Sequence, residues 1–373
     1  MFSVLIFIII LSIMILVHEF GHFYQAIRLG IRVEKFSLGF GPKVFGFKKG
    51  LTEYLLCLIP FGGYVKLAGD SREELKGERY EFLNRAPLDR AKVIFAGPAL
   101  NYFLAFFCFW LVNILGYPNI TTKVGMVMPD YPAQKAGVLK GDIIAAIDGK
   151  KVQFWPELQG IIYHSKKTEV ELDILRDGSR LKLTAALEQK VVKNILGVNQ
   201  KINLMGIQSA GEAVLVRHNP LEGFVLAGSS LWNLTVLTLN AFGRMLTGGL
   251  SLKESVTGPL GMFYVTSEAV KIGISAVLHL MAVLSASLAI FNLLPFPVLD
   301  GGHLFFLGLE KLRGRQLSPK TEDKITRAGL GLIITLAVFV FLNDWVKYGV
   351  WEKVSGVKKG SESFLTGKES LQK

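Results

Sequence analysis

Residues 2–22 read FSVLIFIIILSIMILVHEFGH, an apolar run that ends in two histidines and a glutamate. A helix needs about 20 mostly apolar residues to cross the hydrocarbon of a membrane, and residues 2–27 supply them. The run has no basic start and no small-residue cleavage site, so we read it as a retained span rather than a signal peptide. The first span therefore carries ionisable side chains into the bilayer, where they are costly without a function.

The composition indicates membrane spans combined with a polar domain. The 373 residues are 50% hydrophobic, with a mean hydropathy of +0.40 and a formal charge of +12. Lysines and arginines gather beside apolar segments, in 28–92, 311–327 and after Lys347, which is typical of loops next to a membrane rather than of a nucleic-acid-binding face. We expect a lipid bilayer as partner and no nucleic acid. Cys57 and Cys108 are far apart, which excludes a disulfide framework.

Three further segments are candidates for crossing the membrane: 93–115, 276–309 and 328–346. Within 276–309 the stretch PFPVLDGG should break the helix midway. Residues 221–247 are apolar but carry Ser, Thr and Asn throughout, and we expect them to lie along the membrane surface rather than to cross. The predicted fold is a multi-pass α-helical membrane protein with about four transmembrane helices.

Two stretches between the spans have other patterns. Residues 33–70 alternate β-favouring residues with Gly-rich turns and predict a small membrane-associated β-hairpin or sheet, while the charged residues 71–92 predict a solvated loop. Residues 122–187 predict an independent α+β module with a DG hairpin turn. The predicted organisation is a membrane half (1–115), the module (116–190), a connector with amphipathic helices at the membrane surface (191–275), a second membrane half (276–347) and a polar tail (348–373).

The motif His18-Glu19-Phe20-Gly21-His22 places two histidines on one face of a helix, one turn apart. Two such imidazoles can bind one metal ion, and Glu19 between them can reach a water on that ion. A lone histidine on an apolar helix is more often a core residue, but a glutamate buried beside it makes that interpretation poor. The motif therefore predicts a metal site.

A catalytic zinc ion takes three protein ligands and keeps one position open. Asp300 is the best candidate for the third ligand, because it is the only carboxylate between Glu268 and Glu310 and lies in the broken segment. Alternatively, Asp300 only caps the helix that resumes after the break, but capping leaves the cost of burying its charge largely unmet. His303 is a less favoured ligand.

Four motifs together resemble the site-2 protease family of intramembrane zinc metalloproteases, which are peptidase M50-like, and within it the bacterial regulator-of-sigma-E protease branch. They are HEFGH (18–22), GFGP (39–42), IPFGGYVKLAGD (59–70) and NLLPFPVLDGG (292–302). The resemblance implies that His18, His22 and Asp300 bind Zn²⁺ and that Glu19 is the catalytic base. The implied activity is hydrolysis of peptide bonds within or near transmembrane segments.

The module resembles a PDZ domain of the bacterial protease type over VGMVMPDYPAQKAGVLKGDIIAAIDGKKV (124–152). The best-known members of the branch carry two such domains in tandem, whereas this chain shows one. That departure puts a gating role that depends on a tandem pair in doubt.

The residues expected to contact substrate are Asn292, Pro295, Pro297, Gly62 and Gly63. Asn292 could hold the substrate backbone or the oxyanion. Alternatively, it could form a polar contact that joins two segments of the chain. The segment 33–66 could offer a strand edge to an extended substrate, or could be a structural hairpin docked to the membrane. By resemblance, the substrates are single-span membrane proteins such as anti-sigma factors or signal peptide remnants.

Charge and resemblance together predict a location in the bacterial cytoplasmic (inner) membrane. The basic loop 28–92 and the active site face the cytoplasm, and the PDZ-like domain lies on the periplasmic side. Two alternatives come from other classes. One is a non-proteolytic membrane scaffold that binds peptide termini through its PDZ-like domain. The other is a metal transporter, which would need ligands along a path, whereas the chain offers one cluster.

Overall fold

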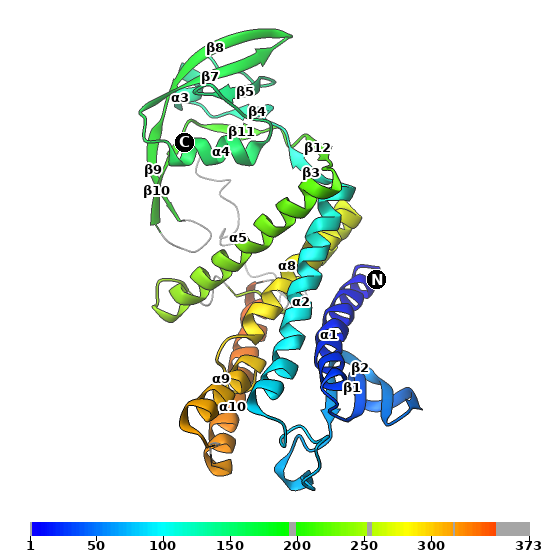
Figure 1. The fold of residues 1–373 in the computed structure, drawn as a ribbon. Coiled ribbons are helices and arrows are strands. Elements are labelled where there is room, and N and C mark those ends of the chain that lie inside the picture. Colours follow the sequence, from blue (N-terminus) through cyan, green and yellow to red (C-terminus); the bar gives the residue numbers. More distant parts are fainter. Residues whose placement is uncertain (1, 194–198, 252–255, 316–317, 348–373) are drawn as a thin grey trace, which may run out of the picture.

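A computed structural model describes residues 2–193, 199–251, 256–315 and 318–347 (Figure 1). The helices form an elongated bundle, with an α/β module at one end and a β-hairpin beside the first helix near the other end. The helices of the bundle are α1 (Phe2–Arg28), α2 (Pro87–Leu115), α5 (Pro220–Leu246), α7 (Pro259–Ile272), α8 (Ile274–Asn292), α9 (Asp300–Arg313) and α10 (Pro319–Lys347). The predicted combination of long apolar helices with separate sheets is confirmed.

Within the described residues, five helices are long and apolar enough to cross a membrane: α1, α2, α5, α8 and α10. Helices α1, α2 and α10 contain predicted segments in full, and α8 contains the part of 276–309 that precedes the break. The fifth, α5, qualifies by length and composition, although its sequence favours a position along the membrane surface. The count of about four crossings therefore stays a prediction, and α5 is the helix that decides it.

The segment 276–309 is broken, as its prolines and glycines predict. Helix α8 ends at Asn292, α9 begins at Asp300, and the intervening chain packs against the start of α9. A Cβ atom at Gly302 would collide with the Phe296 carbonyl oxygen. Only glycine permits this approach, which sets Asp300 in the first turn of α9.

The predicted membrane-associated sheet is a hairpin of two long antiparallel strands, β1 (Val33–Lys49) and β2 (Thr52–Leu67). Register shifts curl the hairpin, so that Leu38 of β1 faces Leu56 on one side and Gly63 on the other. The arm 63–67 of β2 is therefore an outer edge of the sheet, and β2 packs against α1.

The prediction of a solvated loop for residues 71–92 holds for the exposed residues 72–79 and is wrong for Glu81 and for the start of α2. The Glu81 side chain is only 2% exposed and accepts hydrogen bonds from the backbone N–H groups of Lys76, Gly77 and Glu78. The last residues of the stretch already belong to α2, which begins at Pro87. The high charge of the stretch predicts exposure, but the Glu81 carboxylate is buried and holds the loop together through hydrogen bonds to its backbone.

The module between α2 and α5 contains most of the predicted PDZ-like elements. The turn between strands β7 (Glu169–Arg176) and β8 (Ser179–Ala186) has positive φ at both Asp177 (49°) and Gly178 (82°), as a two-residue DG turn requires. The elements of the module are β3 (Tyr117–Ile120), β4 (Val124–Val127), α3 (Pro132–Lys135), β5 (Ile143–Ile147), β6 (Lys150–Lys151), α4 (Trp155–His164), β7 (Glu169–Arg176), β8 (Ser179–Ala186), β9 (Glu188–Lys193), β10 (Asn199–Leu204), β11 (Ile207–Ser209) and β12 (Ala213–Val216).

The last strands of the module return to its beginning. Strand β11 pairs with β4 and β12 pairs with β3, so the chain as far as Val216 joins the same fold. The predicted module ended at 190, because strands that pair with partners about 80 to 100 residues earlier leave no local signal. The domain boundaries themselves stay predictions, and the tail 348–373 lies outside the described residues.

Candidate metal centre

The second half of α1 carries the HEFGH motif, and its two histidines face one point. Their Nε2 atoms lie 3.2 Å apart. Asp300, at the start of α9, places its Oδ2 atom 3.2 Å from His18 Nε2 and 3.6 Å from His22 Nε2. The three side chains are only 13% to 18% exposed. Residues nearly three hundred positions apart thus form one compact cluster.

The donor atoms of this cluster fit a zinc ion. Two imidazole nitrogens and a carboxylate oxygen form a known catalytic zinc set, and here the three ligand atoms lie within 4.8 Å of one another. The Oδ2 atom of Asp300 is buried and has no hydrogen-bond partner. A buried carboxylate oxygen that accepts no hydrogen bond is costly, and a cation among the three residues removes that cost. The roles of the three residues as ligands stay predictions.

Helix α2 closes one side of the cluster by a close backbone approach. The Nδ1 atom of His22 lies 2.9 Å from the Val93 carbonyl oxygen, a contact that holds the ring with Nε2 toward the cluster. A Cβ atom at Gly97 would collide with the His22 ring and lie 3.0 Å from Cε1 of His18. Any larger residue at Gly97 would therefore displace the histidines.

Sequence reasoning did not assign Val93 and Gly97 to the site. The signal was the stretch AGPALN (96–101), whose small residues suggested only a close contact between helices. Gly21, inside the HEFGH motif, meets this stretch, since a Cβ atom there would collide with the backbone of Ala96. The small residues of both helices thus act together, by letting α2 approach the histidines.

Glu19 lies beside the outer edge of the hairpin. A Cβ atom at Gly63 would lie 3.0 Å from the Glu19 Cγ atom and 3.1 Å from the Ile15 Cγ2 atom, so the arm 63–67 runs next to α1. Gly62, with φ of +146°, packs its backbone against the Phe40 ring. The structure therefore places Gly63 next to Glu19, while Gly62 precedes it in the strand and contacts Phe40.

The other predicted substrate residues lie on the stretch that leads into Asp300. Asn292 ends α8 and is half-buried, and within the described part of the chain no hydrogen bond joins it to the cluster. Pro295 is exposed, and the Pro297 ring packs on α10, 3.0 Å from where a Cβ of Gly329 would lie. These residues are next to the cluster in the chain, and their contacts with substrate stay predictions.

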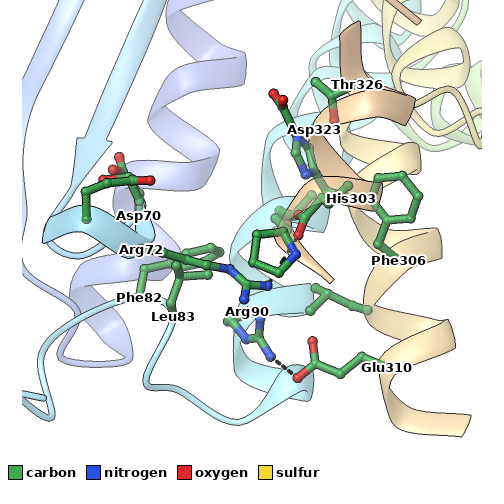
Figure 2. A pocket seen from close by; sticks show the side chains of 16 residues that line it. Asp70, Arg72, Phe82, Leu83, Arg90, His303, Phe306, Glu310, Asp323 and Thr326 are labelled. Atoms are coloured by element: carbon green, nitrogen blue, oxygen red, sulfur yellow. Dashed lines mark hydrogen bonds and ion pairs between the residues drawn. The ribbon is translucent and has the colours of Figure 1, made fainter. Parts of the chain in front are cut away.

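His303, the less favoured ligand, lies outside the cluster. Its exposed side chain lines a cavity of about 310 Å³ together with Asp70, Arg90 and Glu310 (Figure 2). The Arg90 guanidinium donates to the Glu310 carboxylate and so ties α2 to α9. Burial raises the pKa of the Asp70 carboxyl above its usual value, although the Lys66 ammonium opposes the shift. The cavity therefore adjoins the helices that carry the cluster and is bordered by charged groups.

Comparison with known proteins gives matches along most of the chain. The family model described as peptidase family M50 matches residues 6–336. A protein of Rhizobium meliloti, whose name provisionally assigns it to the zinc metalloproteases, is 33% identical, over 91% of this chain and 95% of its own length. Zinc metalloprotease RasP of Shouchella clausii is 29% identical, over 92% and 98% of the two chains.

Regulator of sigma-E protease RseP of Escherichia coli is 29% identical, over 91% of this chain and 97% of its own. Among solved structures, the PDZ domain of an SdrC-like protein from Listeria innocua covers 24% of this chain with 21% identity and a TM-score of 0.20, too low to assign a fold.

Proposed function

The chain belongs to peptidase family M50 and is a zinc metalloprotease, and we propose that it hydrolyses peptide bonds within or near the transmembrane segments of other membrane proteins. The observation that carries the proposal is the cluster of His18, His22 and Asp300. Its histidines lie on α1, a helix long and apolar enough to cross a membrane. A hydrolytic site at that depth acts on polypeptide that is itself in or beside the bilayer.

In this proposal His18, His22 and Asp300 hold Zn²⁺, while Glu19 moves protons. When bound with one open position, zinc acts as a Lewis acid on the scissile carbonyl and lowers the pKa of a water to about 7. Glu19 accepts the proton of the attacking water and delivers it to the leaving amine nitrogen. The Val93 carbonyl keeps the His22 ring in its orientation throughout.

Substrate backbone would pair with the arm 63–67 of β2. The carbonyls of a transmembrane helix are hydrogen-bonded within the helix, so cleavage needs a locally extended chain. An outer strand edge offers main-chain hydrogen bonds to such a chain. The contact between Gly63 and Glu19 supports this assignment, because a strand paired there lies beside the proposed base.

We assign the loop before Asp300 to the opposite side of the substrate. Asn292 would hold the substrate backbone or the oxyanion through its side-chain amide. Pro295 and Pro297 would keep the loop from continuing α8, since proline lacks the N–H group and restricts its own φ. The support is their position in the seven residues that separate α8 from α9.

The proposed location is the inner membrane of a bacterium, with the cluster toward the cytoplasm and the module on the periplasmic side. The basic loop lies at the hairpin end of the bundle, and the module lies at the opposite end, which supports this orientation (Figure 1). Candidate substrates are single-span proteins such as anti-sigma factors or remnant signal peptides. The name of the Escherichia coli relative, a regulator of sigma-E protease, supports the first kind.

The test uses the full chain purified in detergent, its zinc content and the cleavage of a model single-span substrate. We expect about one zinc per chain in the unmodified protein. Glu19→Gln should keep the zinc and lower the cleavage rate by at least about 100-fold, the usual contribution of a general base. Asp300→Ala should lose both the zinc and the activity.

The matched control is Glu268→Gln, the same change at an exposed glutamate of α7 that pairs with Lys271. It should leave zinc content and cleavage unchanged. A scaffold that only binds peptide termini would show no cleavage in any variant. Equal cleavage by wild type and Glu19→Gln, or no zinc in the wild type, would refute the proposal.

A further inference from the structure

One face of α1 carries a stripe of exposed apolar side chains that leads to the end of the helix. The stripe follows helical spacing through Ile13, Leu16, Phe20, Tyr24 and Ile27, each between 37% and 51% exposed. By that spacing the clustered histidines lie on the opposite face of α1. When α1 crosses a bilayer, the stripe is therefore its lipid-facing side.

A cavity of about 380 Å³ lies where the stripe ends. Ile27, the last member of the stripe, lines it together with Ile31 and Leu51, and Arg32 and Tyr80 also line it. Ile27 and Leu51 are 51% and 61% exposed, so the apolar wall of the cavity is accessible from outside. The cavity therefore joins an apolar surface to a cationic group at the end of α1.

One arginine lines this cavity and a second lies against its wall, and neither pairs with a carboxylate within the described residues. Arg32 lines it and lies 5.9 Å from the centre of the Tyr80 ring. Arg85 donates a hydrogen bond of 2.9 Å to the carbonyl oxygen of Gly30, another lining residue. Within the described residues neither arginine forms an ion pair, and the Nε atom of each is buried without a hydrogen-bond partner. The positive charge at the cavity is not neutralised by this part of the chain.

Arginines beside a membrane often serve only to orient the chain, and Arg28 fits that role. It lies in the last turn of α1, where a positive charge also favours the helix dipole, and it is free to reach water. Arg32 and Arg85 differ because part of each guanidinium is buried. Burying positive charge without a counter-ion is costly, and an anionic ligand removes that cost.

We propose that this cavity binds the phosphate headgroup of an anionic glycerophospholipid, with an acyl chain lying along the stripe on α1. Arg32 and Arg85 bind the phosphate, because guanidinium groups match its oxygens in geometry and charge. The acyl chain packs on Ile27, Tyr24 and Phe20. The site is separate from the metal centre and does not depend on the proposed proteolysis.

The experiment measures lipid bound to the intact full-length protein by native mass spectrometry from detergent. Dioctanoyl phosphatidylglycerol and dioctanoyl phosphatidylcholine are titrated separately, and inorganic phosphate is added as competitor. The site predicts at least about fivefold tighter binding of the anionic lipid, the effect expected for one uncompensated arginine near a membrane. Arg32→Gln and Arg85→Gln should each weaken that binding by about fivefold, and excess phosphate should displace little of the lipid.

The matched control is Arg244→Gln, which removes an exposed arginine from the last turn of α5, away from the cavity, and should leave binding unchanged. Leu51→Glu places a carboxylate at an exposed lining position without touching the arginines, and should also weaken anionic lipid binding if an arginine variant fails to fold. Equal affinity for both lipids, equal loss in Arg244→Gln, or displacement by phosphate as effective as by lipid would overturn the proposal.

Discussion

The helices that carry the candidate metal cluster and the α/β module are held together in different ways. The core of the module is a cluster of buried apolar side chains, among them Ile144, Leu158 and Leu172, each 0% exposed. Around the metal cluster the helices instead meet through glycine backbone and through polar groups bonded to backbone atoms, as at Gly97 and between His22 and Val93. Lipid is as apolar as leucine, so within a membrane close packing and polar contacts replace the hydrophobic effect.

Because of this difference, each region should be sensitive to a different kind of substitution. In the module, the loss of buried apolar volume should matter most, because burial drives its folding. Among the helices that carry the candidate metal cluster, the addition of a single methyl group at a close contact should matter most, because the backbones there leave no room.

Gly97→Ala should abolish metal binding. The added Cβ would collide with the His22 ring, so the ring must leave its position in the cluster. We expect zinc content and cleavage activity to fall to background, measured by elemental analysis and by the single-span substrate assay. Gly308→Ala, in α9, is the control because nothing lies within 4 Å of its Cβ position. A Gly97→Ala protein with full zinc would show that the close approach of α2 does not position the ligands.

Leu172→Ala should unfold the module more readily while the metal cluster persists. Leu172 is 0% exposed, and truncating a buried leucine costs about 2–5 kcal/mol of folding free energy. Hydrogen exchange of the full-length protein should rise across 117–216, with zinc content unchanged. Leu181→Ala, at a position that is 37% exposed, should have a much smaller effect. Loss of zinc in Leu172→Ala alone would mean that the two regions unfold as one unit.

Asp344→Asn should loosen the junction of α7 and α10. The Asp344 carboxylate is 0% exposed and accepts hydrogen bonds from the backbone N–H groups of Gly258 (3.0 Å) and Gly261 (3.1 Å) at the start of α7. Such bonds to a charged group contribute about 1.5–3 kcal/mol each, and the amide retains part of that. We expect a lower thermal midpoint and faster amide exchange at the start of α7. Asp323→Asn, on the exposed part of α10, should change neither quantity.

The sequence could predict which side chains form the cluster but not how they are held. HEFGH and Asp300 stand out because ionisable residues in apolar segments are costly, which is a local property of the chain. The contact of His22 with Val93 and that of Asp344 with Gly258 join positions 71 and 86 residues apart, and no local pattern encodes them. The prediction that Glu81 is solvent-exposed was wrong for a related reason. The high average charge of its loop predicts exposure, but does not show which carboxylate accepts hydrogen bonds from the loop backbone.

The elements of the fold likewise divide into those that local sequence predicts and those that depend on distant partners. Helices and the DG hairpin were predictable because periodicity and turn chemistry are local. Strands β11 and β12 were not, because each is short and acquires its structure from partners at the beginning of the module. Local sequence also does not decide whether α5 crosses the membrane. Its apolar length is sufficient for a crossing, but its polar residues favour the membrane surface.

The smallest expected effect is a pH dependence confined to the module. Burial alone would raise the pKa of the Asp142 carboxyl, but hydrogen bonds from the Arg176 guanidinium and the Leu139 N–H outweigh it and hold that pKa below its usual value. Because the folded form binds this proton less readily than the unfolded form, the pair stabilises the module above the ordinary pKa of an aspartate. That stabilisation is lost as the pH falls through the lowered value.

We therefore expect the module of the full-length protein to exchange its amides faster as the pH falls from about 5 to about 3, after correction for the intrinsic rate. Asp142→Asn should lower protection at neutral pH and flatten this dependence, since the amide does not titrate. Asp177→Asn, the same change in the exposed β7–β8 turn, should keep the wild-type profile. An unchanged slope in Asp142→Asn would assign the pH dependence to other carboxylates, of which Asp148, bonded to Lys167, is the first to test.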